Sequence, residues 1–258
     1  MSTDVFRLMV AVGIFMVLIL LRLEAAWFGA AEYDEPGRKR GAWTRLSWYA
    51  MGAGLLVALY YVHPSPHDTL TLLAGKRWDS LVIGLSLAAL GVGQAALFAL
   101  FHYGYLRLPS LRAYPNAMVN AIGTAVIDEA VFRGALLGTM LALGVPASAA
   151  ILESTIVYLL VTRLAAPGHH PYMATLAAAM GLIFGWATIV TGGLGAAIVG
   201  HAATSFAVFA FCGHAGQVAT AGNEPEEIEA RTEIPAGWED AWHPSLQGRG
   251  AVPRHGTR

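Results

Sequence analysis

The sequence predicts an all-α fold, a polytopic bundle of about seven transmembrane helices, and two observations carry that prediction. Of the 258 residues, 56% are hydrophobic and only 13% are charged, with a mean hydropathy of +0.54, far from the composition of soluble domains. Apolar runs close to the roughly 20 residues that cross a hydrocarbon core also recur along the chain. A formal net charge of -1 excludes the basic surface that nucleic-acid binding requires.

The apolar runs define the expected helices in order. They cover residues 5–30, 43–62, 79–101, 115–143, 147–165, 171–190 and 193–213. We expect one membrane-spanning helix in each run. The chain then divides into N-terminal helices (1–114), a core (115–215) and a polar tail (216–258) that is acidic at first and later contains Gly, Pro and Arg. Such a tail is typical of a flexible appendage.

The first run has two interpretations. Its purely apolar centre, Leu8–Leu21, is short and small residues follow at 29–31, which is typical of a cleaved signal peptide. Against that, the apolar character resumes beyond Arg22, and the start carries Asp4 instead of a cluster of positive charge. We interpret the run as a retained membrane anchor in which Arg22 snorkels to the interface.

The short loops predict the orientation, because Lys and Arg are retained on the cytoplasmic side of a membrane. The loop after the first run contains four basic residues: Arg38, Lys39, Arg40 and Arg45. Placing it in the cytoplasm puts Arg107, Arg112 and Arg163 on the same side and leaves Lys76 and Arg77 as exceptions. We therefore expect a multi-pass protein of the bacterial inner (plasma) membrane with a cytoplasmic C-terminus.

Polar side chains occur in a regular pattern inside the fourth run. They recur every four residues and so share one face of a helix: Asn116, Asn120, Thr124 and Asp128. Glu129 and Arg133 form an i, i+4 pair beside them. Ionisable groups at membrane depth are energetically costly unless they are paired or face a water-filled cavity. We therefore expect this face of the helix to point away from the lipid.

Two other runs carry similar stripes. In the fifth run Ser154, Tyr158 and Thr162 recur every four residues, and in the seventh run His201 and Ser205 lie one turn apart. Together with the fourth run, these stripes predict that three helices line one polar site.

Each feature also has a structural interpretation. Glu129 with Arg133 would be a neutralised pair that locks helices together, and stripes of Asn and Thr are common packing contacts between membrane helices. A single intramembrane histidine such as His201 is often a hydrogen-bonded packing residue. Glu153 follows Pro146 closely enough to lie at the interface instead of at depth, and its separation from Thr162 argues against a role at the site.

The combination of motifs resembles the CPBP intramembrane protease family, also called the Abi family, which includes type II CAAX prenyl endopeptidases and bacteriocin-processing or bacteriocin-immunity proteins. The first family motif is Glu-Glu-x-x-x-Arg, usually continued as Phe-Arg-Gly. The stretch DEAVFRG matches it with Asp in place of the first Glu: Asp128, Glu129, Phe132, Arg133 and Gly134.

The other two motifs match in part. HAATS follows a Gly-rich apolar stretch and resembles the third motif, His-x-x-x-Asn, with His201 retained and Ser205 in place of Asn. YLLVT lies where the second motif, Phe-x-x-x-His, is expected and supplies Tyr158 and Thr162 instead. The resemblance covers about residues 115–213.

The resemblance implies an intramembrane endopeptidase that cleaves a membrane-associated peptide or protein tail with a carboxylate-activated water. With the polar stripes, it predicts five catalytic residues: Asp128, Glu129, Arg133, His201 and Ser205. It predicts four substrate-binding residues: Asn120, Thr124, Tyr158 and Thr162. The cofactor and the metal ligands stay unknown, because the sequence does not decide between a divalent metal such as zinc and a metal-free site.

The departures from the motifs keep other functions open. A hydroxyl at Thr162 is a poor metal ligand and does not act as an acid or base near pH 7. The alternative is therefore a non-catalytic relative that acts as a binding, immunity or scaffold protein in the membrane, and a small-solute or proton transporter is a third class. The expected partners are membrane lipid and a peptide or protein-tail substrate, with no nucleic acid.

Overall fold

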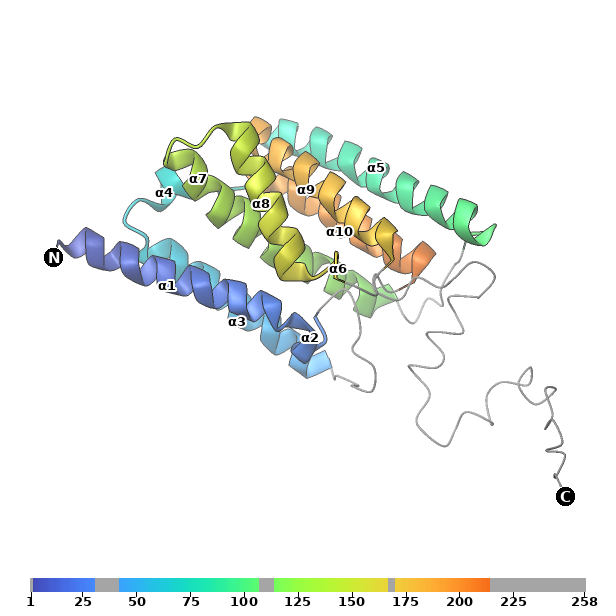
Figure 1. Ribbon diagram of the computed structural model, residues 1–258, viewed down its shortest axis with the longest axis horizontal. Coiled ribbons are helices and arrows are strands. Elements are labelled where there is room, and N and C mark those ends of the chain that lie inside the picture. Colours follow the sequence, from blue (N-terminus) through green and yellow to red (C-terminus); the bar gives the residue numbers. More distant parts are fainter. Residues whose placement is uncertain (1, 31–41, 107–113, 167–169, 214–258) are drawn as a thin grey trace, which may run out of the picture.

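The computed structural model describes residues 2–30, 42–106, 114–166 and 170–213, except the side chains of residues 42, 114 and 116. Every regular element in these ranges is a helix, which confirms the predicted all-α fold (Figure 1). The elements are α1 (Thr3–Leu23), α2 (Ala25–Phe28), α3 (Ala42–Val62), α4 (Pro66–Thr69), α5 (Arg77–Tyr103), α6 (Tyr114–Glu129), η1 (Ala130–Leu137), α7 (Gly138–Ala142), α8 (Ala147–Thr162), α9 (Pro171–Thr191) and α10 (Gly195–Cys212). The tail predicted at 216–258 lies outside the described residues.

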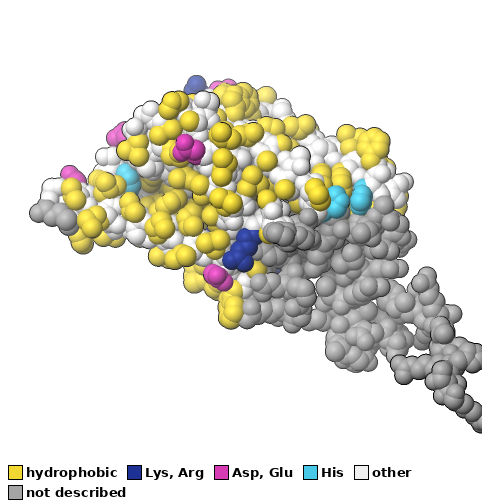
Figure 2. Space-filling view, viewed as in Figure 1, with side chains coloured by type: hydrophobic (Ala, Val, Ile, Leu, Met, Phe, Trp, Pro, Cys, Tyr) yellow, Lys and Arg dark blue, Asp and Glu magenta, His cyan; other side chains and the backbone are white. Residues whose placement is uncertain are grey.

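Four described helices are long and apolar enough to cross a membrane: α1, α5, α9 and α10. Helices also occupy the other three predicted runs, and α8, with 16 residues, is shorter and equally apolar in character. Large hydrophobic side chains are exposed along the described helices, and on the face that Figure 2 shows charged side chains are few and scattered. A surface of this kind is stable against lipid and unstable against water, so the chain is an integral membrane protein.

The helices pack as two groups joined at the centre of the bundle. α1 lies along α3, and α10 packs against α5 on one side and against α6 on another (Figure 1). α8 packs against α9, and α1 reaches both α8 and η1. The helix that carries the first motif is therefore enclosed by helices from both halves of the chain.

The first motif lies in one continuous helical segment with a wide turn in its middle. Residues Ala130–Leu137 form a π-helix, and both Glu129 before it and Gly138 after it keep ordinary helical φ and ψ angles. Short π-helical stretches inside α-helices are frequent at functional sites. A π-helix also disturbs the i to i−4 hydrogen bonds, and here Thr71 compensates: its N–H donates to the Gly134 carbonyl at 3.0 Å, and its hydroxyl to that of Arg133 at 2.5 Å.

The segment that contains Thr71 links two ends of the site. The N–H groups of Leu194 and Gly195 donate to the carbonyls of Leu73 and Ala74 at 2.8 and 3.1 Å. This segment therefore binds the π-helix through one residue and the start of α10 through the next few. It holds the two site-bearing helices at a fixed separation.

Candidate active site

The two adjacent carboxylates of the first motif face different helices. Asp128 accepts two hydrogen bonds from Arg22 of α1, from Nε to Oδ1 at 2.6 Å and from Nη2 to Oδ2 at 2.9 Å. Glu129 turns toward α10, where its Oε1 lies 2.7 Å from Nδ1 of His201. Successive side chains project about 100° apart around a helix, which explains how neighbours in sequence reach opposite partners.

Glu129 is the centre of a small group of polar side chains. Its Oε1 also lies 3.4 Å from Nη1 of Arg133, one turn further along the helix. The side chains of Glu129 and Arg133 are 0% exposed, and His201 is 5% exposed. Within the described part of the chain, Oε2 of Glu129 and the three guanidinium nitrogens of Arg133 have no hydrogen-bond partner. These groups retain unused donors and acceptors at membrane depth.

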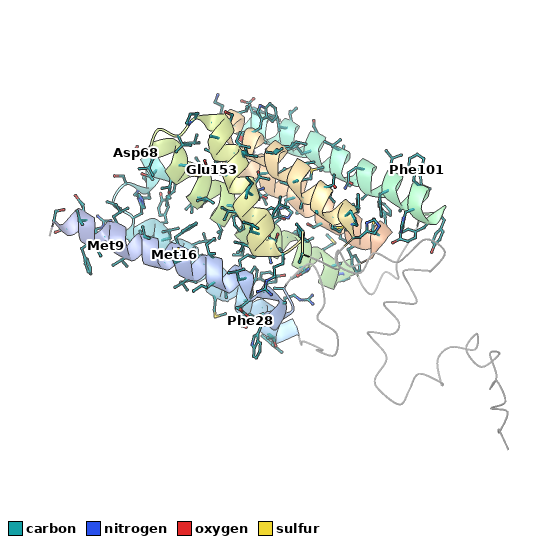
Figure 3. All side chains as sticks on the ribbon, viewed as in Figure 1. Met9, Met16, Phe28, Asp68, Phe101 and Glu153 are labelled. Carbon is teal, nitrogen blue, oxygen red and sulfur yellow. The ribbon has the colours of Figure 1, made fainter. Side chains whose placement is uncertain are left out.

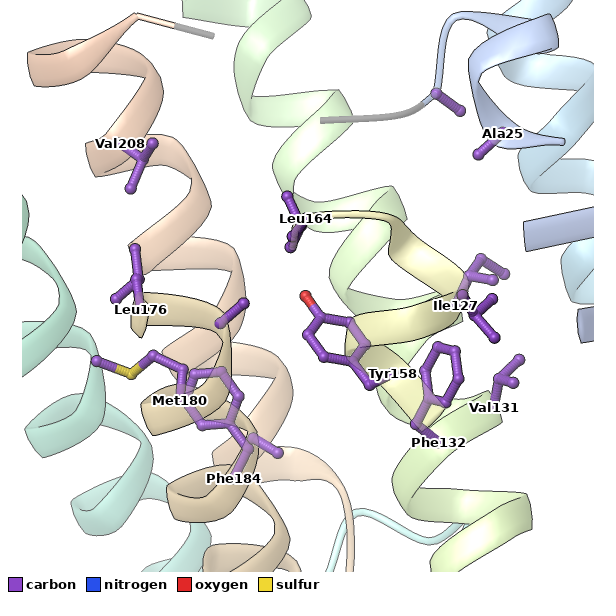
Figure 4. Packing of buried hydrophobic residues seen from close by; sticks show 14 of the residues in the cluster. Ala25, Ile127, Val131, Phe132, Tyr158, Leu164, Leu176, Met180, Phe184 and Val208 are labelled. Carbon is purple, nitrogen blue, oxygen red and sulfur yellow. The ribbon is translucent and has the colours of Figure 1, made fainter. Parts of the chain in front are cut away.

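Aromatic rings enclose the polar group. The Arg133 guanidinium lies over the Tyr158 ring, with Cζ 4.7 Å from the ring centroid, a cation–π contact. Phe132 meets Tyr158 edge to face at 5.3 Å between centroids, and Phe184 of α9 stacks on His201 at 5.7 Å. Figure 4 shows Tyr158 beside Phe132, with Phe184 on the neighbouring helix. The site thus lies inside the apolar core.

Gly181 of α9 leaves room for the Arg133 side chain between the helices. A Cβ atom at Gly181 of α9 would lie 2.5 Å from Cγ2 of Thr155 and 3.3 Å from Nη2 of Arg133. A larger residue at this position would push α9 away from α8 or displace the guanidinium. The small residue therefore allows a large cation to be buried between helices.

The structure corrects the expectation for Arg22. We expected this side chain to snorkel to the membrane interface, but it is 3% exposed and bound to Asp128. The physical reason is the carboxylate on α6, which stabilises the cation within the bundle and makes an interfacial position unnecessary.

The structure brings together four of the sequence-predicted residues and places the others around them. Glu129, Arg133, Tyr158 and His201 converge from α6, η1, α8 and α10. Ser205 lies one turn after His201 on α10 and is half-buried. The convergence of the fourth, fifth and seventh apolar runs is thereby confirmed.

The remaining predicted residues make their own contacts. The Tyr49 hydroxyl of α3 donates to Oδ1 of Asn120 at 2.6 Å and lies 3.5 Å from the Thr124 hydroxyl, so both residues contribute to the packing of α3 on α6. The buried Thr162 donates its hydroxyl to the Tyr158 carbonyl at 2.8 Å. Glu153 is exposed on α8 and contributes nothing to the buried polar group (Figure 3).

The residues at the site do not form a metal centre. Across the described ranges, no three His, Cys, Asp or Glu side chains lie close enough together to hold an ion. A catalytic zinc ion takes three protein ligands and a water. Here Glu129 and His201 are the two candidate ligands, Asp128 is bound to Arg22, and Thr162 offers only a hydroxyl. We therefore assign no step to a metal.

Sequence reasoning missed the partners that come from outside the motifs. Arg22, Trp48, Gly181 and Phe184 each touch the site or its supporting residues. Only Arg22 left a signal in the sequence, because an arginine inside an apolar run requires a carboxylate partner.

Comparison with known proteins agrees with the motifs. Residues 110–207 match the family model described as type II CAAX prenyl endopeptidase Rce1-like. No curated protein and no solved structure matches the chain. The matched segment contains Glu129, Arg133, Tyr158 and His201, the residues that the fold brings together. This segment is therefore similar to the type II CAAX prenyl endopeptidases, which agrees with the resemblance of the motifs to the CPBP family.

Proposed function

We propose that the chain is an intramembrane endopeptidase that hydrolyses a peptide bond of a membrane-associated peptide or protein tail. The observation that carries the proposal is the contact between Glu129 and His201, a carboxylate and an imidazole 2.7 Å apart, buried among apolar side chains with a cation beside them. A buried carboxylate with an unused oxygen is a suitable general base for a water molecule.

The chemistry assigns one role to each group. Glu129 accepts a proton from water through Oε2 while the water oxygen bonds to the carbonyl carbon of the scissile peptide, and the same carboxyl group then returns the proton to the leaving amine. Arg133, with its unused N–H groups, stabilises the carboxylate and the negative charge that develops on the carbonyl oxygen. His201 holds the carboxylate in place through Nδ1.

The remaining predicted site residues keep supporting roles in this proposal. Tyr158 positions Arg133 through its ring, and Ser205 adds a hydroxyl one turn from His201. Thr162, Asn120 and Thr124 support the helices around the site through the contacts described above, and substrate binding by them stays a prediction. Asp128, although it is beside Glu129, is held by Arg22.

The direct test compares peptide termini in membranes from cells that carry the intact protein, the Glu129→Gln protein, or no protein. The matched control is Glu153→Gln, which makes the same chemical change at an exposed carboxylate on α8. We expect a set of termini that requires the intact protein, persists with Glu153→Gln and is lost with Glu129→Gln, all at equal protein abundance.

Two results would contradict the proposal. Termini that persist in the Glu129→Gln cells would show that this carboxylate is not the base. Termini that are identical in all four strains, together with a phenotype of the deletion, would favour a non-catalytic relative that binds a peptide or protein tail as an immunity or scaffold protein.

A further inference from the structure

Arg22 and Asp128 form a buried ion pair that links α1 to the first motif. Both contacts of the fork are short, at 2.6 and 2.9 Å, and both side chains are almost completely buried. Asp128 lies within the matched segment 110–207, whereas Arg22 lies far outside it. The first helix of the chain therefore supplies a charged partner to the motif of a domain to which it does not belong by sequence.

Trp48 also contacts the end of α1 and the guanidinium of Arg22. The indole N–H of Trp48, on α3, donates to the carbonyl of Leu21 at 2.9 Å, near the end of α1, where carbonyl groups lose their helical partners. Cζ of Arg22 lies 5.9 Å from the centroid of the same indole. Trp48 is 0% exposed, so one buried ring fixes both the end of α1 and the position of its cation.

Two carboxylate contacts define the rotation of α6 about its axis. Asp128 meets Arg22 on the α1 side, and Glu129 meets His201 on the α10 side. Adjacent side chains on one helix move together, so a rotation that weakens the first contact also displaces the Glu129 carboxylate from the second. A bidentate guanidinium–carboxylate pair is directional, which makes it suited to hold this rotation.

We propose that Arg22 is a positioning residue of the site: it binds Asp128 and so keeps Glu129 in contact with His201. The inference rests on the proposed peptidase function for its kinetic consequence. It assigns to Asp128 a positioning role in place of the catalytic one expected from the sequence. It also makes α1 a permanent part of the site, in agreement with a retained anchor and against a cleaved signal peptide.

The test uses the full chain in lipid nanodiscs with Arg22→Gln, Arg22→Lys and the exchanged pair Arg22→Asp with Asp128→Arg. The matched control is Arg7→Gln, which removes another arginine from α1, one that donates to the carbonyls at the end of α3. Two quantities are measured on folded protein: the cleavage kinetics, and the NMR resonance of the proton shared between His201 Nδ1 and Glu129, assigned by its loss in His201→Gln.

The expected results separate positioning from folding. Arg22→Gln lowers kcat about 10- to 100-fold, because a misplacement near 1 Å has effects of that size, while KM changes little. The shared-proton resonance shifts or broadens. Arg22→Lys and the exchanged pair recover part of both signals, and Arg7→Gln leaves both as in the intact protein.

The outcomes that overturn the inference are distinct from failure of the proposed function. If Arg22→Gln protein keeps the intact kcat per folded molecule and an unchanged resonance, the ion pair is only structural and the inference is wrong. If the intact protein cleaves nothing while the resonance still depends on Arg22, the peptidase function is wrong and the positioning role stands. If only the yield of folded Arg22→Gln protein falls, with both signals normal in what remains, the inference is also overturned.

Discussion

At Asp128 and Glu129 the chain places two carboxylates side by side in an apolar helix, where an unpaired ionised group costs several kcal/mol. In the structure, a separate partner for each carboxylate offsets this cost. Arg22 binds one carboxylate through two hydrogen bonds, and His201 with Arg133 meets the other. Both carboxylate oxygens of Asp128 accept a hydrogen bond from Arg22. In contrast, Oε2 of Glu129 has no hydrogen-bond partner among the described residues. In the proposed mechanism, this difference separates a carboxylate that positions the helix from the carboxylate that acts as the general base.

The position of the missing second-motif histidine gives a prediction at the residue scale. Thr162 is 2% exposed and its hydroxyl is bound to the carbonyl of the preceding turn. Thr162→His adds a ring where packing is dense, so we expect a loss of about 1–3 kcal/mol in the free energy of unfolding and no gain in cleavage. Thermal unfolding in detergent and the cleavage rate measure both effects.

The control for this prediction is Thr162→Ser, which keeps the hydroxyl and removes one methyl group. A higher cleavage rate in Thr162→His than in the intact protein would contradict the prediction. It would show that an imidazole at this position reaches the substrate or the water after all.

At the scale of elements, Gly91 allows one of the close contacts between α5 and α10. A Cβ atom at Gly91 would overlap the side chain of Thr204, which lies three residues after His201 on α10, whereas nothing lies within 4 Å of a Cβ at Gly93. We expect Gly91→Ala to force the helices apart and to lower the free energy of unfolding by about 1–3 kcal/mol. Gly93→Ala should be neutral or stabilising by up to about 1 kcal/mol, since alanine is the better helix former.

These two variants differ by only two positions in one helix, so their comparison isolates packing from helix propensity. Unfolding in a detergent series provides the free energies. Equal effects of Gly91→Ala and Gly93→Ala would contradict the close approach of α5 to α10. Because Thr204 shares a helix with His201, we also expect slower cleavage in Gly91→Ala alone.

The sequence predicted the long apolar helices but not the π-helix. The apolar runs predicted where the long helices lie, because hydrophobicity reports which segments avoid water, and four of these helices are long and apolar enough to cross a membrane. The π-helix at Ala130–Leu137 left no such signal, and the hydrogen bonds that its carbonyls accept from Thr71 come from another segment of the chain. A contact between residues 62 positions apart is a property of the folded chain.

At the scale of the whole molecule, the same division applies to the site. The motifs predicted that Glu129, Arg133, Tyr158 and His201 belong together, since ionisable groups in membrane helices must face one another. The partition of the carboxylates between Arg22 and His201 was not predictable, because it depends on how α1, α6 and α10 are rotated. The snorkelling expected of Arg22 was wrong for that reason.

The central claim is that Glu129 and His201 work as one catalytic unit, and the most direct measurement is a double-variant cycle on cleavage. The protein is placed in lipid vesicles with a peptide that spans one of the termini found in cells. The rates of the intact protein, Glu129→Gln, His201→Gln and the double variant are then compared.

We expect each single variant to lose about 100-fold or more in kcat/KM, and the double variant to be no worse than the poorer single one, because residues that act as a unit are strongly non-additive. Cleavage by Glu129→Gln at the intact rate, or losses that multiply in the double variant, would contradict the account.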